Sequence, residues 1–163
     1  MAHTPDMFAG ILTSAVLCAG GEDVQSAVVD DMVDGLERDG DLDSQIARSR
    51  KHRKEAGDFG MEIASALLVP VLIEAGKGLW AAYLKKLGEK AGGQLVDLTY
   101  QQVSKLVQWL FTGEERDQAQ AAFNERLRAA AAQQGLSSEQ VDALVAAVSS
   151  PALTAALDAK AKG

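Results

Sequence analysis

The chain has 163 residues, of which 47% are hydrophobic and 5% aromatic, and its net charge is −7. This length fits one domain with a core packed mainly by Leu, Val, Ile and Ala. The negative charge repels nucleic acid, so we do not expect nucleic acid as a partner. The single Cys excludes an internal disulfide framework and is typical of a reducing compartment, and we expect a cytoplasmic protein that is either free or peripheral at a membrane.

The abundance of Ala, together with only three Pro, favours helices over strands. We predict an all-α protein, a compact bundle of about six to eight helices with short connections at Gly residues. One domain is expected over residues 1–163. Within it, residues 1–57 form a charged helical part, residues 58–112 an apolar and aromatic core, and residues 113–163 short, capped, Ala-rich helices.

The first two predicted helices cover residues 6–19 and 22–38. Pro5 stands at the first helical position and Gly20 follows the end, and the apolar face of this helix includes Phe8, Ile11 and Leu12. In residues 22–38 apolar residues recur every four positions, while carboxylates lie toward the other side. The second helix is therefore predicted to be acidic and amphipathic.

Two blocks of opposite charge follow each other in the first third of the chain. Residues 22–43 contain nine carboxylates and one Arg, whereas residues 48–54 form a basic cluster of Arg48, Arg50, Lys51, Arg53 and Lys54 around His52. Residues 41–56 are either a weak helix or a connector. The basic cluster is a candidate contact for a protein partner or an anionic lipid surface. It could also fold against the acidic helix, or form a solvated helix face.

An apolar run covers residues 61–84. For residues 61–73 we favour a helix that is kinked or restarted at Pro70, although residues 67–73 would also fit a strand. Gly76 and Gly78 are predicted to interrupt the helical run, and a further helix is expected over residues 79–90.

Residues 63–84 are long enough to cross a membrane, with 22 residues. Glu74 and Lys77 lie near the centre of this run, and a charge there costs about 2.5 to 3.5 kcal/mol. We therefore prefer burial in the helical bundle. Insertion by an oligomer that pairs Glu74 with Lys77 around a polar lumen is kept as an alternative.

The last part of the chain is predicted to contain four helices. Residues 94–111 show an apolar stripe that suits a central core helix, and Gly92 and Gly93 precede it. Thr112 followed by Glu115, and Ser137 followed by Gln140, fit the capping box that starts a helix. Pro151 is predicted to start the last helix.

Several aromatic residues fall in one stretch and predict either the packing centre or a partner-binding face. The candidate interface or apolar segment consists of Leu68, Pro70, Leu72, Glu74, Lys77, Trp80, Tyr83, Tyr100 and Trp109.

No catalytic, metal-binding or cofactor-binding residues are predicted. Asp39, Asp41 and Asp43 alternate like calcium ligands, but the loop has an Arg where its twelfth residue should be a Glu. The two histidines, His3 and His52, have no ligand or triad partner at a recognisable spacing.

We expect a non-enzymatic helical protein that acts by protein–protein interaction, with a protein partner or as a homo-oligomer. The first alternative is a membrane-active or pore-forming effector that uses residues 61–84, with residues 48–54 contacting lipid. The second alternative is a small enzyme with a carboxylate-based site.

Overall fold

Helices dominate the computed structural model, which describes residues 4–19, 23–36, 41–42, 44–46, 65–90, 92–93, 98–148 and 151–162. The predicted all-α class and multi-helix bundle are confirmed. The helices with defined bounds are α1 (Thr4–Ala19), α2 (Asp23–Asp34), α5 (Ser65–Ala82), α6 (Leu84–Lys90), α7 (Tyr100–Thr112), α8 (Arg116–Gln133), α9 (Ser138–Val148) and α10 (Pro151–Lys162).

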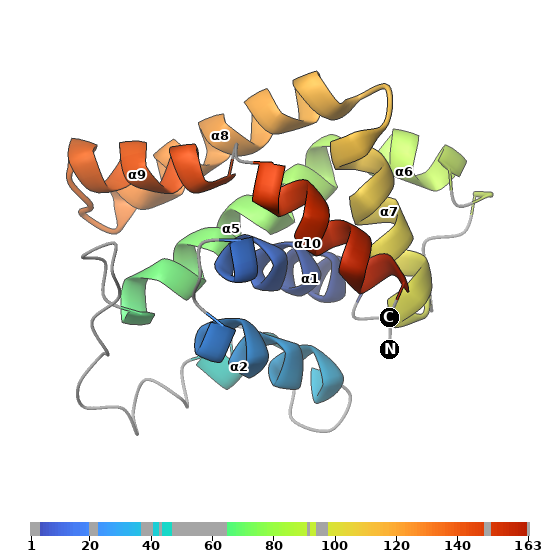
Figure 1. Ribbon diagram of the computed structural model, residues 1–163, viewed down its shortest axis with the longest axis horizontal. Coiled ribbons are helices and arrows are strands. Elements are labelled where there is room, and N and C mark those ends of the chain that lie inside the picture. Colours follow the sequence, from blue (N-terminus) through green and yellow to red (C-terminus); the bar gives the residue numbers. More distant parts are fainter. Residues whose placement is uncertain are drawn as a thin grey trace.

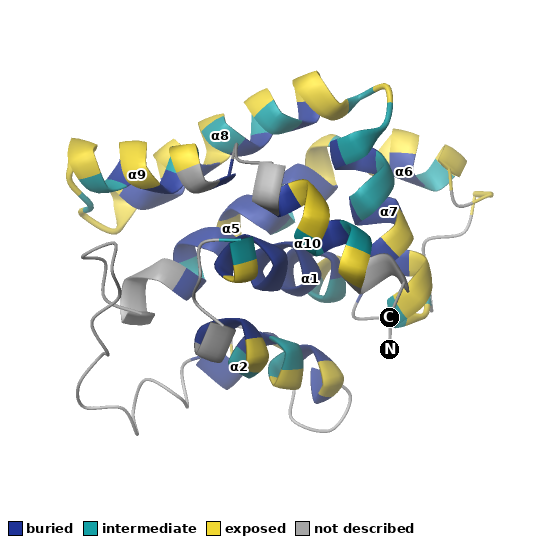
Figure 2. Ribbon diagram, viewed as in Figure 1, coloured by how far each residue is buried: buried dark blue, intermediate teal, exposed yellow. Residues whose placement is uncertain are grey.

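Helix α1 occupies the centre of the bundle, where α2, α5, α7 and α10 pack around it (Figure 1). It is buried over almost its whole circumference, as Figure 2 shows. The predicted face with Phe8, Ile11 and Leu12 is buried, but so are Thr13 and Ser14 on other sides of the helix. The Ser14 and Ser26 hydroxyls lie 2.8 Å apart, so each of these two serines has a hydrogen-bond partner at the contact between α1 and α2.

Residues 65–82 of the apolar run form one helix, α5, which continues through Pro70, Gly76 and Gly78. The prediction that the two glycines interrupt the helix is therefore wrong. A Cβ atom at Gly76 would lie 3.0 Å from both the Cα and the Cβ of Ala9 in α1. Gly76 thus allows the two helices to approach closely, and the packing of α5 on α1 outweighs the low helix propensity of glycine.

The helical run instead changes at Tyr83, where a turn separates α5 from α6. Helix α6 ends before Gly92 and Gly93, whose φ angles are +80° and +89°. These left-handed conformations favour glycine, which agrees with the predicted break.

Helix α7 begins six residues later than predicted, at Tyr100. The hydroxyl of Thr99 accepts a hydrogen bond from the backbone N–H of Gln102, and the side chain of Gln102 accepts one from the N–H of Thr99. This reciprocal capping box fixes the start of the helix. Leu98 precedes the cap and lies outside the helix.

The predicted capping box at Thr112 is wrong. The Thr112 hydroxyl donates to the carbonyl of Gln108 in the preceding turn, and Thr112 is the last residue of α7. Because this hydroxyl points back into α7, α8 begins at Arg116 without a side-chain cap. The second predicted box is confirmed, since Ser137 and Gln140 exchange hydrogen bonds at the start of α9.

Helix α8 packs on α5 and α7, and α9 packs on α8, so that the C-terminal part covers the side of the bundle away from α2 (Figure 1). Helix α10 begins at Pro151 as predicted and crosses α1 and α7. Among the helices that the structure describes, none is both long and apolar enough to cross a membrane.

Candidate functional site

The basic cluster of Arg48, Arg50, Lys51, Arg53 and Lys54 lies outside the described residues. The interpretations based on it therefore stay predictions. The structure does place most of the candidate residues of α5, α7 and their neighbours.

Several of the α5 candidates belong to the core. Leu72 is fully buried, and Trp80 is 7% exposed and packs against Phe8 of α1 with 5.3 Å between ring centroids. Pro70 is half-buried, and Leu68 lies in α5, although its side chain is outside the described part. On the folded molecule, Leu72 and Trp80 hold α5 against α1 and present no surface to a partner.

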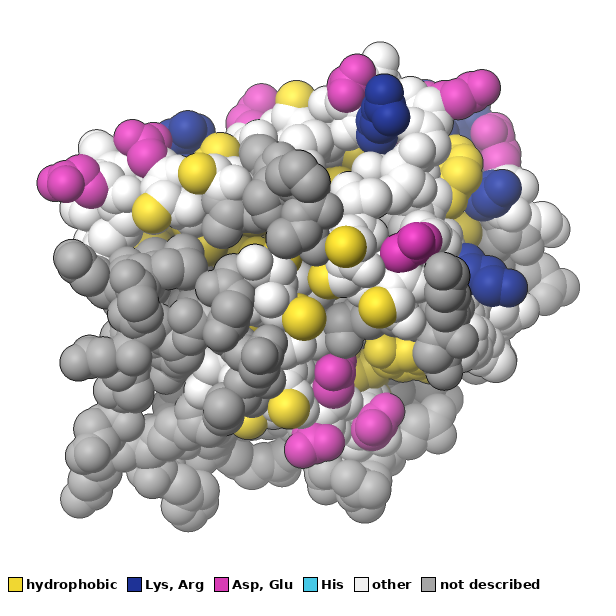
Figure 3. All heavy atoms as spheres, viewed as in Figure 1, with side chains coloured by type: hydrophobic (Ala, Val, Ile, Leu, Met, Phe, Trp, Pro, Cys, Tyr) yellow, Lys and Arg dark blue, Asp and Glu magenta, His cyan; other side chains and the backbone are white. Residues whose placement is uncertain are grey.

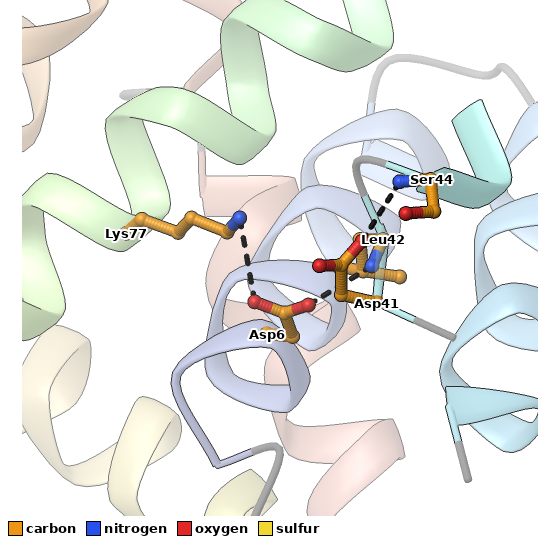
Figure 4. A network of polar contacts seen from close by, with 5 residues as sticks. All are labelled: Asp6, Asp41, Leu42, Ser44 and Lys77. Carbon is orange, nitrogen blue, oxygen red and sulfur yellow. Dashed lines mark hydrogen bonds and ion pairs between the residues drawn. The ribbon is translucent and has the colours of Figure 1, made fainter. Parts of the chain in front are cut away.

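The charged residues of α5 have different surroundings. Glu74 is exposed, whereas the ammonium group of Lys77 lies 3.3 Å from a carboxylate oxygen of Asp6 in α1. The other oxygen of Asp6 accepts a hydrogen bond of 2.9 Å from the backbone N–H of Leu42, as Figure 4 shows. Asp6 therefore joins α1 to α5 and to the segment that begins at Asp41.

The same segment carries its own cap. Asp41 accepts a hydrogen bond of 2.8 Å from the backbone N–H of Ser44 (Figure 4), and Gln45 donates from its side chain to the carbonyl of Met32 in α2. Leu42 and Ile46 are buried. This part of the chain is thus packed into the bundle. The hydrogen bond and the ion pair of Asp6 hold parts of the fold together.

An apolar and basic surface lies at the junction of α5 and α6. Leu84 is a large apolar residue with 45% exposure, and the half-buried Tyr83 precedes it in the turn. At the other end of α6, the ammonium group of Lys90 lies 5.8 Å from the ring centroid of the half-buried Trp109. Lys85 is exposed between them. We call Tyr83, Leu84 and Lys85 at the start of α6, together with Lys90 and Trp109 at its end, the α6 face; Lys85 and Lys90 are five residues apart and point to different sides of the helix.

Charged neighbours on α6 and α8 border this surface. Lys86 donates a hydrogen bond of 2.8 Å to Glu115, and this bond raises the pKa of Lys86. Burial raises the pKa of Tyr83, the negative charge of Glu115 raises it further, and Lys86 and Arg126 oppose this. The charges of the α6 face are those of Lys85 and Lys90, and the exposed Glu89 lies between these two lysines in α6.

A second surface, of opposite charge, lies on α2. Ala27, Asp31 and Asp34 are exposed at spacings of four and three residues, which places them on one side of the helix. We call these residues the α2 face. Tyr100 is near this helix, since burial and then the negative charge of Asp30 raise its pKa. Figure 3 shows Asp and Glu side chains gathered over α2, and Lys and Arg at the right edge with Asp and Glu side chains beside them.

The aromatic candidates do not form a single cluster. Trp80 pairs with Phe8, while Phe111 pairs edge-to-face with Phe123 at 5.8 Å. Tyr83 and Trp109 lie at the α6 face, and Tyr100 lies toward α2.

Sequence reasoning missed two features of this region. The lysines of α6 could have been predicted to form a basic segment from the local sequence, because three of its seven residues are Lys. No sequence pattern predicts the contacts of Asp6 with Lys77 and Leu42, because these residues are far apart in the sequence and only folding brings them together.

Within the described ranges, no group of three or more His, Cys, Asp or Glu side chains is arranged to hold a metal ion. Comparisons with protein-family models, with curated proteins and with solved structures give no match for this chain.

Proposed function

We propose that this protein is a non-enzymatic binding domain that uses the α6 face to hold an acidic segment of a polypeptide chain. The observation that carries the proposal is the exposure of Leu84 beside Tyr83 and Lys85 at the start of α6, in a protein of net charge −7. Aromatic and aliphatic anchors surrounded by charged residues are typical of protein-binding surfaces. The local positive charge favours a partner that supplies carboxylates.

Burial of α5 supports protein binding over a membrane-active role. Releasing this helix would expose six large apolar side chains, which together stabilise the fold by roughly 9 to 18 kcal/mol at about 1.5 to 3 kcal/mol each. The side chains are Val69, Val71, Leu72, Ile73, Leu79 and Trp80. This amount is comparable to the whole free energy of unfolding of an ordinary domain, about 5 to 15 kcal/mol. Binding through an already exposed surface needs no such rearrangement.

The proposal is tested by selecting a displayed library of random peptides on the immobilised full chain. We expect the selected peptides to combine Asp or Glu with Leu, Phe or Trp. A synthetic peptide of this type should bind Leu84→Glu at least tenfold more weakly than the unchanged protein, because the new carboxylate repels it and the apolar anchor is lost. Leu84 is exposed, so the fold should be preserved, which circular dichroism checks.

Ala121→Glu provides the matched control, since Ala121 is exposed on α8 and the change adds the same carboxylate at another surface. This variant should bind the peptide like the unchanged protein. Selected peptides without an acidic bias, or equal binding by Leu84→Glu, would refute the proposal.

A further inference from the structure

We infer that Arg126 of α8 binds a carboxylate of the acidic segment, close to Tyr83 at the start of α6. The inference rests on the proposed function and names the residue that recognises the acid. It requires that the segment carries an Asp or Glu near the apolar residue that contacts Leu84.

The side chain of Arg126 lies across α5 at Gly78. A Cβ atom at Gly78 would lie 3.0 Å from the Cδ atom of Arg126 and 3.1 Å from its Nη1 atom, so the missing side chain of Gly78 makes room for the arginine. Helix α8 packs on α5, yet Arg126 is exposed. The methylene groups of Arg126 therefore cover α5 while its guanidinium group stays in contact with water.

The charge of Arg126 reaches Tyr83, which follows Gly78 in the chain by about one and a half helical turns. Burial and then the charge of Glu115 raise the pKa of Tyr83, whereas the positive charges of Lys86 and Arg126 lower it. The guanidinium group is therefore close enough to the Tyr83 side chain for the two to interact electrostatically. Since Leu84 directly follows Tyr83, one short segment of a partner can contact Leu84 and the guanidinium group together.

Arg126 differs from the neighbouring cations in its lack of a partner. The ammonium group of Lys86 lies 2.8 Å from Glu115, and Arg128 lies 3.1 Å from Asp142. Among the residues that the structure describes, no carboxylate lies within ion-pair distance of Arg126, and the residues three and four positions away in α8 are Ala or Phe. A guanidinium group offers two parallel N–H donors to a carboxylate, so Arg126 can bind one from a partner.

Carboxylates of this chain limit the attraction that Arg126 exerts over long distances. Glu125 precedes Arg126 in α8, and the exposed Glu74 lies four residues before Gly78 in α5. Direct contact with the guanidinium group, rather than long-range attraction, therefore distinguishes an acid from its amide. An exposed ion pair changes an equilibrium by up to about fivefold, and paired hydrogen bonds add to this, so we expect a preference of about 5- to 10-fold for the acid.

Binding of peptide pairs to the full chain tests the inference. Each pair consists of a peptide from the display selection and the same peptide with one Asp or Glu changed to Asn or Gln. The unchanged protein should bind the acid of at least one pair about 5- to 10-fold more tightly than the amide. Arg126→Gln should bind both members of that pair equally, because it lacks the group that distinguishes them. Arg126→Lys should keep part of the preference, since it keeps the charge but loses the paired donors.

Gly78→Ala provides an independent test, because it keeps Arg126 and displaces its side chain. The added Cβ atom pushes against the Cδ atom of Arg126, so this variant should bind the acidic peptide more weakly although its fold is at least as stable. Arg128→Gln is the control for charge, since it removes the same charge from another exposed position of α8. This control should bind both members of every pair like the unchanged protein.

The inference would be overturned if Arg126→Gln kept the full preference for the acid in every pair, or if the unchanged protein had no such preference. Unchanged binding by Gly78→Ala would also overturn it. The proposed function would stand in each of these cases as long as Leu84→Glu weakens binding of the acidic peptides. Selected peptides without an acidic bias would overturn both the proposed function and the inference.

Discussion

Replacing Gly76 by Ala adds one methyl group at the contact between α1 and α5. This carbon would lie 3.0 Å from the Cα and Cβ of Ala9, whereas carbon atoms attract each other best at about 3.5 to 4.0 Å. Helix α1 is packed on several sides and cannot move away freely. Overpacking of this kind costs about 1 to 3 kcal/mol, and the higher helix propensity of Ala returns about 1 kcal/mol. We expect Gly76→Ala to lower the free energy of unfolding by about 0 to 2 kcal/mol.

Gly78 provides a matched comparison two residues further along α5. A Cβ atom there would meet the side chain of Arg126 at 3.0 Å, but this side chain is long, flexible and largely exposed. It can move aside, so Gly78→Ala should keep most of the propensity gain of about 1 kcal/mol. The two variants should differ by about 2 kcal/mol, or about 4 to 8 °C in melting temperature.

Thermal and guanidinium unfolding, followed by circular dichroism, measure this difference. If Gly76→Ala stabilised the protein as much as Gly78→Ala, the close contact between α1 and α5 would be refuted. Ala9→Gly supplies a further check, because it removes one of the two atoms that crowd the new methyl group. The double variant Ala9→Gly with Gly76→Ala should lose less free energy of unfolding than the two single variants lose in sum, by about 0.5 kcal/mol or more.

Three further predictions concern polar groups. Asp6→Ala should lower the free energy of unfolding by about 2 to 3 kcal/mol, because it removes the acceptor of a backbone N–H as well as the partner of Lys77. Lys77→Gln should cost only about 1 kcal/mol, and equal costs in denaturant unfolding would contradict this view. Thr99→Ala should cost about 1 kcal/mol by removing the cap of α7, and an unchanged melting temperature would argue against that cap. Tyr83 and Tyr100 have raised pKa values, so ultraviolet titration should give midpoints above about 10 for both, and Tyr83→Phe should leave only the midpoint of Tyr100. The protonated forms of these two tyrosines contribute fully to the stability of the fold below the pKa of an unfolded tyrosine, and this contribution decreases as the pH rises above about 10. Titration midpoints at the ordinary tyrosine value would contradict the burial of these rings.

Patterns that depend on neighbouring residues were predicted well. The helical periodicity of residues 6–19 and the capping box at Ser137 and Gln140 are local, and the structure confirms both. The same kind of local reasoning failed at Thr112, because a threonine hydroxyl can cap the next helix or bond back to its own helix. Sequence spacing alone does not distinguish these two bonds.

The candidate surface was predicted only in part. Tyr83, Trp109, Trp80 and Leu72 were named together as residues of the packing centre or of an interface, and of these Trp80 and Leu72 lie in the core. Hydrophobicity shows that a residue can be buried, and the exposure of an apolar side chain depends on which other helices cover it. Leu84 and Leu87 lie in the same short helix, yet Leu84 is 45% exposed and Leu87 is fully buried.

The sequence by itself determined the helical class, the net charge and the cap at Ser137, because propensity, composition and hydrogen bonds between near neighbours are local properties. The tertiary structure alone decided that α1 is central, that Gly76 is a packing contact, and that Asp6 holds Lys77 and Leu42. Each of these depends on residues that are distant in the chain and meet only when the helices pack, so no local pattern encodes them.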